Sequence, residues 1–174
     1  MEVEKAIKTK REIRKYDQSK TVNEETILKI LEAGRLGQSS KNRQPTRFIV
    51  IRDRTKLLKL SKCTYTGDFL ADASFGVAVI TEDAKLPEID ATRAVQNMML
   101  VAWSQGVGSC WITNFWDKGL EILDVPMNGR YRLITVIPFG YLHPDEVKPK
   151  GKRLRKEFHE VVFKESFTQP WYKD

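Results

Sequence analysis

The sequence predicts one domain in which helices and β-strands alternate around buried central strands. The run Phe75–Thr81 is apolar on both faces, as in a central strand that helices cover on each side. The run from Asp90 to Gln105 carries apolar residues at helical spacing and predicts the longest helix. The 174 residues show neither a repeat nor a Gly/Ser-rich or Pro-rich linker, so we expect a single domain with a C-terminal arm.

Periodicity and capping signals predict the other elements. Thr21 and Asn23 are competing N-caps for a long second helix, and Glu24 lies three residues after Thr21, as in a capping box. Pro87 marks a boundary before the longest helix, and Pro126 ends a short one. The expected further elements are helices over 3–10, 24–36, 53–61 and 120–125 and strands over 46–52 and 131–140.

A polar loop runs directly into the strand at 46–52. Six successive residues, 39–44, offer hydroxyls, amides and cations, and Pro45 biases Gln44 toward extended geometry. The following run Phe48–Ile51 is apolar and β-branched, which predicts a buried strand. Polar groups at the end of a rigid core element can hold a ligand, although a solvated loop has the same composition.

The chain is basic, with a net charge of +7 and a pI near 9.4. The cations concentrate in residues 5–15 and 148–156. Such blocks bind polyanions, membrane surfaces or phosphorylated small molecules, or they are solvated surface. Aromatic residues are not interleaved with the basic runs, which disfavours a nucleic-acid-binding module. The charged N-terminus and the absence of an apolar run of about 20 residues favour a cytoplasmic protein.

Side chains that often catalyse reactions or bind metals are sparse. Cys63 and Cys110 are far apart in the sequence, and neither they nor His143 and His159 have a metal-ligand spacing. Cys110 has no basic partner nearby in the sequence, which favours a small buried apolar residue over a nucleophile. His143 precedes Pro144 in a turn and is either a proton donor or an exposed turn residue. No catalytic triad, carboxylate pair or metal site is expected.

Four separated segments resemble motifs of the FMN-dependent nitroreductase family, in that family's order. Residues 10–16 resemble RRSIRxF, 38–46 resemble PSxxNxQPW, 90–102 resemble DxxxAxQNxxLxA, and 106–113 resemble GLGSxWxG. Residues 155–162 also resemble the terminal RKPLEEVV. Among the departures from the motifs, Glu12 replaces a serine, Gln38 a proline and Thr46 a tryptophan. An acid at position 12 is unfavourable beside a phosphate unless it turns away.

The resemblance implies an α+β fold with a mixed sheet flanked by helices, assembled as a homodimer with FMN at the interface. Residues 1–162 would form the FMN-binding domain, and residues 163–174 an arm that packs on the partner subunit. The resemblance implies that the FMN phosphate is bound by the cationic box Lys10, Arg11, Glu12 and Arg14 and by the terminal Arg153 or Arg155, with Lys152 as a neighbour. It implies that the flavin ring or the ribityl chain is bound by Ser39, Ser40, Asn42 and Gln44, from either subunit. The backbone of Ile112 and Thr113 would also contact the ring.

The implied function is flavin-dependent reduction. NADH or NADPH would reduce FMN, which would then reduce a nitroaromatic, a quinone or a related acceptor, with no obligate catalytic side chain. The sequence is short between Cys63 and Asp90, where larger family members carry additional helices, so we expect an open substrate side. Related proteins of this fold also carry out flavin fragmentation and deazaflavin-related chemistry, which leaves the substrate open. The alternatives are a flavin carrier without turnover and a basic nucleic-acid-binding module.

Overall fold

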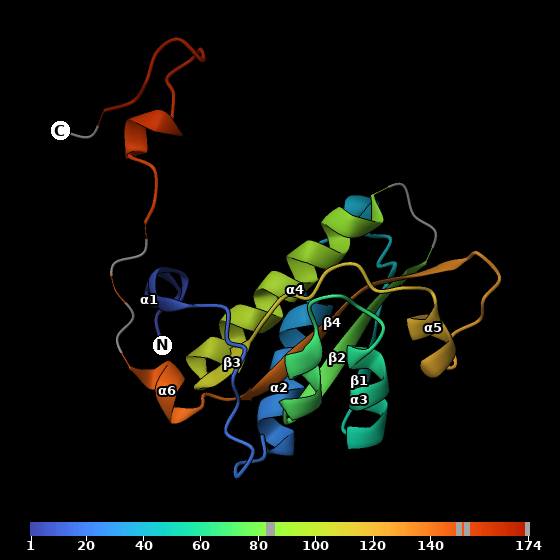
Figure 1. Cartoon of the computed structure of the whole chain (residues 1–174). Coiled ribbons are helices and arrows are strands. Elements are labelled where there is room, and N and C mark those ends of the chain that lie inside the picture. The colour runs from blue at the N-terminus through green and yellow to red at the C-terminus, as the bar shows by residue number, and fades with distance from the viewer. Residues whose placement is uncertain (83–85, 149–150, 152–153, 173–174) are drawn as a thin grey trace.

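The computed structural model describes residues 1–82, 86–148, 151 and 154–172. Within these ranges, β1 (Thr46–Ile51), β2 (Phe75–Glu82), β4 (Tyr131–Tyr141) and β3 (Val107–Ser109) form one sheet in the order β1-β2-β4-β3. Neighbouring strands pair antiparallel throughout, and a parallel bridge between Glu12 and Ser109 adds the mixed pairing. The expected α+β class is therefore confirmed (Figure 1).

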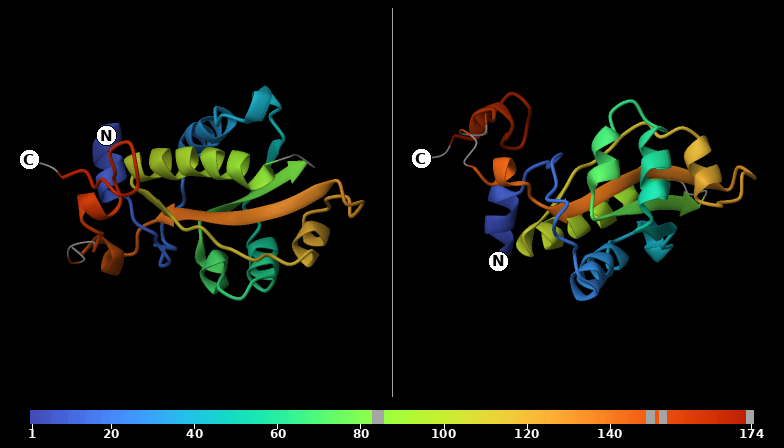
Figure 2. Two further views of the ribbon diagram at one scale, coloured as in Figure 1. Left: turned by 90° about the horizontal axis from the view of Figure 1, so that it is seen from above. Right: turned by 60° about the horizontal axis from the view of Figure 1, so that its bottom comes forward.

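Helices cover both faces of the sheet (Figure 2). Successive residues of β2 point to opposite faces, so Val77 and Val79 pack with α2 (Glu24–Arg35) and α4 (Pro87–Ser104). Ala78 and Ile80 pack on the other side with α3 (Arg54–Ser61), the 3-10 turn η2 (Asp68–Asp72) and α5 (Lys118–Ile122). Seven of the eight residues of β2 are buried, which confirms the predicted central strand.

The helix starts follow the local capping chemistry. Asn23, rather than Thr21, caps α2, because its side-chain oxygen accepts a hydrogen bond from the backbone N–H of Thr26. Asp53 caps α3 in the same way through the N–H of Lys56. The long helix α4 begins at Pro87, three residues before the predicted start, since a proline is well placed in a first turn that needs no N–H donor.

The strand predicted over residues 46–52 is present, but the prediction that it is buried is wrong. β1 lies at the edge of the sheet and pairs on one side only, with β2. Only Ile51 is buried, and Val50 is 37% exposed. Phe48 and Ile49 still pack, one against each helical layer. An apolar run therefore does not distinguish an edge strand from a central one.

The segment after α1 (Val3–Thr9) is fixed against the opposite edge of the sheet. The N–H of Ile13 donates a hydrogen bond to the carbonyl of Ser109 at 2.9 Å, and the Tyr16 hydroxyl donates to the carbonyl of Ile13 at 2.7 Å. Ile13 is fully buried and lies directly over Gly108, where an added Cβ would be 2.8 Å from the Ile13 Cβ. A glycine is therefore required for this close approach.

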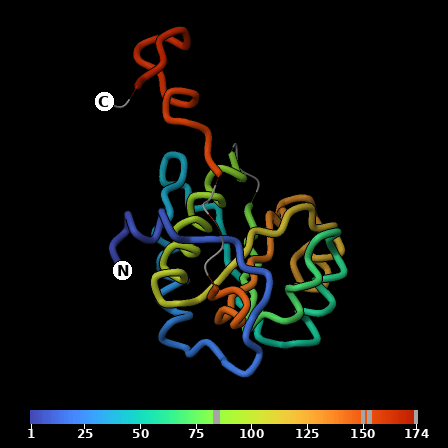
Figure 3. Tube along the Cα trace, turned by 60° about the vertical axis from the view of Figure 1, so that its left-hand side comes forward, coloured from blue at the N-terminus to red at the C-terminus, as the bar shows by residue number. Residues whose placement is uncertain are grey.

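The C-terminal segment leaves the body of the molecule after α6 (Pro144–Val147), as Figures 1 and 3 show. It contains the 3-10 turn η3 (Phe158–Glu160) and then folds on itself, with the rings of Phe163 and Phe167 stacked at 4.5 Å. Phe167 remains 83% exposed. Packing of residues 163–174 on a partner subunit stays a prediction, and residues 173–174 lie outside the described ranges. No helix in the described part of the chain is long and apolar enough to span a membrane.

Replacing Gly108 by Ala should lower the free energy of unfolding by about 1–3 kcal/mol, because the new methyl group overpacks Ile13. Urea denaturation of the two proteins measures the difference. Gly151→Ala is the matched control, since no atom of the described residues lies within 4 Å of its added Cβ. Equal unfolding midpoints for Gly108→Ala and the wild type would contradict this packing.

Candidate functional site

Residues 10–14 form a cationic segment at the edge of β3. The Glu12 carboxylate turns inward: one oxygen pairs with the Lys10 ammonium, and the other accepts a hydrogen bond from the Trp111 N–H at 2.9 Å. The acid that departs from the family motif is thus bound to the protein itself. It also ties residues 10–14 to the segment that follows β3.

The surroundings of Glu12 shift two pKa values. Burial raises the pKa of Glu12, but hydrogen bonds from Lys10 and the Trp111 N–H outweigh it and leave the pKa below its usual value. Burial and then the nearby Glu12 carboxylate raise the pKa of the Cys110 thiol to about 12. Cys110 is 1% exposed, as predicted for a buried apolar residue. A pKa this high keeps the thiol protonated at neutral pH, which argues against a thiolate nucleophile.

The two arginines of this segment lie over aromatic rings. Arg11 donates a hydrogen bond to the carbonyl of Glu146 at 2.6 Å, and its guanidinium lies 6.0 Å from the centroid of the Trp103 ring. Arg14 is exposed and lies 5.9 Å from the centroid of Phe69. Among the described residues Arg14 has neither an ion pair nor a hydrogen bond, so its five N–H donors can bind an external anion.

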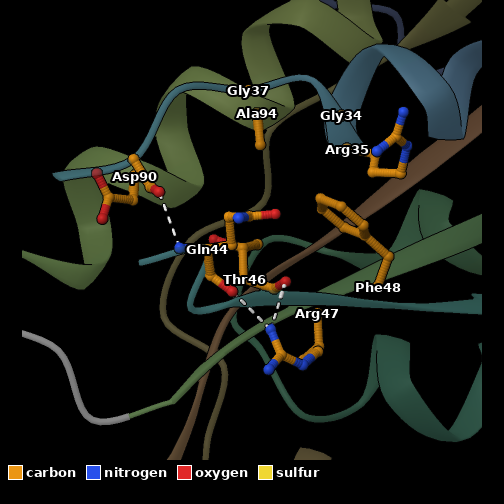
Figure 4. Close-up of a pocket in the computed structure, with 10 residues that line it drawn as sticks. Gly34, Arg35, Gly37, Gln44, Thr46, Arg47, Phe48, Asp90 and Ala94 are labelled. Carbon is orange, nitrogen blue, oxygen red and sulfur yellow. Dashed lines mark hydrogen bonds between the residues drawn. The ribbon is translucent and has the colours of Figure 1, made fainter. Parts of the chain in front are cut away.

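Residues 37–45 connect α2 to β1 in an irregular loop around the 3-10 turn η1 (Ser40–Asn42). Lys41, Asn42 and Gln44 all have positive φ angles, between 51° and 53°. The predicted extended geometry of Gln44 is therefore wrong. The Gln44 N–H turns back and donates to the Ser39 Oγ at 2.8 Å, and the Arg47 guanidinium donates to the carbonyl of Gln44 at 2.7 Å (Figure 4). These contacts outweigh the local preference imposed by Pro45.

The loop is anchored on the first turns of α4. The buried Asp90 carboxylate accepts a hydrogen bond from the Ser40 N–H at 3.1 Å. Beside this contact lies a cavity of about 290 Å³, into which Figure 4 shows Gln44 and Phe48 facing Ala94. The sequence motif contained Asp90, but nothing in the sequence indicated that its carboxylate fixes the loop.

The segment after β3 presents unpaired backbone donors. Ile112 is buried, and its carbonyl accepts a hydrogen bond from the Thr135 hydroxyl at 2.7 Å. The carbonyl of Thr113 accepts one from the Thr64 hydroxyl at 2.8 Å. Thr113 and Asn114 are exposed, and their N–H groups have no hydrogen-bond partner among the residues that the structure describes. Exposed N–H groups of this kind can donate hydrogen bonds to a ligand.

The predicted site residues fall into two groups at opposite ends of α4. Residues 10–14 lie beside Trp103, because the Arg11 guanidinium lies over the Trp103 ring. The Trp103 indole N–H also donates a hydrogen bond to the hydroxyl of the preceding Thr9. The loop with Ser39, Ser40, Asn42 and Gln44 lies beside Asp90. Positions 90 and 103 are 13 steps apart in α4, which corresponds to about 20 Å of helix. One chain thus brings Lys10, Arg11, Glu12 and Arg14 together with Ile112 and Thr113, but not with the loop.

The terminal cations do not join either group in the described structure. Arg155 is exposed on the projecting C-terminal segment, where its guanidinium donates to the carbonyl of Leu154 at 2.8 Å. Lys152 and Arg153 lie outside the described residues. His143 caps α6, and its Nδ1 accepts a hydrogen bond from the Asp145 N–H.

Comparison with known proteins defines the class. The profile of the Nitroreductase family matches residues 7–68 and 59–141. A provisionally named NADH dehydrogenase/NAD(P)H nitroreductase of Archaeoglobus fulgidus is 36% identical over 169 residues, which cover 90% of this chain and 89% of the relative. The structure is that of an α+β oxidoreductase fold, and the chain belongs to the nitroreductase family.

Solved structures agree with this assignment. An FMN-dependent nitroreductase from Clostridium difficile superposes with a TM-score of 0.82 at 31% identity, covering 93% of this chain and 98% of that one. A provisionally named nitroreductase from Desulfovibrio desulfuricans, in complex with FMN, gives a TM-score of 0.82 at 28% identity and covers 96% and 98% of the two chains.

Acid should weaken the tie between residues 10–14 and the sheet. A carboxylate whose folded-state pKa is lowered stabilises the protein above its unfolded-state pKa, and this contribution is lost as the pH falls through the folded-state value. Between about pH 6 and about pH 3, the wild type should therefore lose more stability in urea denaturation than Glu12→Gln. Glu2→Gln is the control and should follow the wild type, because the Glu2 side chain makes no described hydrogen bond. Parallel curves for all three proteins would refute the role of Glu12.

Proposed function

We propose that this protein is an FMN-dependent oxidoreductase that uses NADH or NADPH to reduce a nitroaromatic, a quinone or a related acceptor. The observation that carries the proposal is the pair of N–H groups at Thr113 and Asn114, which have no hydrogen-bond partner in the described part of the chain, on the sheet edge that also holds the exposed Arg14. FMN, when bound, supplies the hydride chemistry. The FMN complex of the Desulfovibrio desulfuricans relative supports the choice of cofactor.

The residues of the chain bind and orient the cofactor. Arg14, with Lys10 and Arg11 beside it, would hold the phosphate, because a guanidinium binds phosphate oxygens bidentately. Glu12 would keep its charge directed at Lys10 and the Trp111 N–H, away from the phosphate. The N–H groups of Thr113 and Asn114 would donate hydrogen bonds to the ring. These donors lie on a segment fixed by Thr64 and Thr135, so the ring would meet a rigid surface.

We further propose that a second copy of the chain completes the site. The loop at 39–44 lies about 20 Å along α4 from residues 10–14, so its side chains would serve the cofactor of the partner. An apolar cavity of about 370 Å³ between α1, α2 and α4 supports a dimer surface on this face. Its lining includes Val3 and Leu36, which are 69% and 62% exposed in the single chain. Large exposed apolar side chains at one place favour association.

The cofactor and the turnover can be tested separately. Purified protein should bind FMN in a fluorescence titration, and anaerobic NADH or NADPH should bleach the flavin absorbance, which a quinone then restores. Bound FMN that neither donor bleaches would instead identify a flavin carrier. A protein without FMN binding would overturn the proposed function.

Arg14→Ala should weaken FMN binding by roughly tenfold or more, because a charge-assisted hydrogen bond contributes about 1.5–3 kcal/mol and 1.4 kcal/mol corresponds to tenfold. Riboflavin, which lacks the phosphate, should lose much less affinity. Equilibrium titration with both flavins measures the difference. Arg132→Ala removes an exposed arginine that pairs with Glu88 and should alter neither affinity. An equal loss of affinity for FMN and riboflavin would show that Arg14 does not bind the phosphate.

A site shared between subunits should be restored by mixing two defective proteins. One protomer carries Arg14→Ala, and the other carries Ser39→Ala with Asn42→Gly, where glycine tolerates the positive φ of Asn42. Each homodimer has two defective sites, whereas a heterodimer has one intact site. Dissociation and reassembly of an equal mixture should therefore restore about one quarter of the wild-type FMN sites. A site within one chain would gain nothing from mixing, so unchanged FMN binding would refute the shared site.

A further inference from the structure

Two exposed aromatic rings form a corner next to the proposed flavin-binding segment. The rings of Tyr65 and Trp116 have centroids 5.0 Å apart and an interplanar angle of 85°. Tyr65 is 79% exposed and Trp116 is 44% exposed. The two residues come from loops 51 positions apart in the sequence, so only the fold brings them together.

Hydrogen bonds fix the backbones that carry these rings. The Trp116 N–H donates to the carbonyl of Cys63 at 3.0 Å. The buried Thr64 hydroxyl donates to the carbonyl of Thr113 at 2.8 Å. The loop at 63–65 is therefore attached at two points to the segment at 113–116. The corner is preorganised, and a ligand that used it would lose little freedom in the protein.

The same hydrogen bonds place the corner beside the N–H groups of Thr113 and Asn114, for which the described residues offer no partner. Thr64, which holds the carbonyl of Thr113, directly precedes Tyr65, and Trp116 follows Thr113 by three residues. Phe69, the ring beneath the Arg14 guanidinium, lies four residues after Tyr65 in η2. The aromatic corner thus borders the residues proposed to hold the cofactor.

We propose that Tyr65 and Trp116 form the acceptor-binding subsite and select planar aromatic acceptors. The inference rests on the proposed function, since it places the acceptor beside the cofactor. A flat molecule stacked on one ring would present its edge to the other, and both arrangements are favourable for aromatic pairs. A compact, non-aromatic acceptor gains nothing from this corner. The two side chains act as specificity-determining residues and take no part in the electron transfer.

Removing either ring should selectively weaken the binding of aromatic acceptors. Tyr65→Leu and Trp116→Leu keep an apolar side chain but lose the ring. In steady-state turnover of the FMN-loaded protein, the KM for menadione should rise about two- to tenfold relative to the KM for ferricyanide. Isothermal titration calorimetry with 2-naphthol, a planar compound that flavins do not reduce, should show the same loss of affinity. Tyr65→Phe, which keeps the ring, should retain both values.

Controls separate this subsite from the function and from the dimer. Tyr172→Leu removes an exposed ring that stacks on His159 in the C-terminal segment, and it should leave the KM for menadione unchanged. A wild type that binds no FMN would overturn both proposals. Flavin reduction by NADH or NADPH with an unchanged ratio of KM values in the two leucine variants would overturn the subsite alone. Weaker self-association of these variants in sedimentation equilibrium, with that ratio unchanged, would assign the corner to the subunit interface instead.

Discussion

The contact between Ile13 and Gly108 determines where the cationic residues of this protein lie. The glycine lets a fully buried side chain approach the β3 backbone, and the Ile13 N–H then reaches the carbonyl of Ser109. This contact also positions the rest of residues 10–14, so that Glu12 accepts a hydrogen bond from the Trp111 N–H and Arg14 lies over the Phe69 ring. A packing constraint in the core thereby sets the geometry of a polar surface. Because protein interiors are close-packed, a shift here would be transmitted to the charged groups.

The sequence predicted the elements whose signals are local. The doubly apolar β2 was expected from neighbouring residues alone, and so was the N-cap at Asn23, one of two candidates. The burial of β1 was not, because an apolar run carries no information on whether a second strand pairs beside it. The backbone of Gln44 was also mispredicted, since its φ is set by hydrogen bonds to Ser39 and Arg47 rather than by Pro45.

The site residues show the same limit. Motif order identified residues 10–14 and 39–44, and the structure keeps each group together. The distance between the groups depends on the length of α4 and on which end each group contacts, which no motif encodes. The aromatic corner of Tyr65 and Trp116 had no sequence signal, because the two residues meet only through the loops attached at Cys63 and Thr113. Sequence reasoning thus found the groups that we propose bind phosphate and missed the surface beside them.

The edge position of β1 bears on self-association through strands. A free edge offers unpaired N–H and C=O groups to any extended segment, which is a route to aggregation. In this chain an arginine lies near each end of the strand, and both are engaged: Arg47 pairs with Glu82 at 2.8 Å and Arg52 with Glu24 at 2.9 Å. Exposed ion pairs of this kind contribute little to folding stability. Their larger effect is to place charge near both ends of the edge strand, which disfavours pairing with an incoming strand.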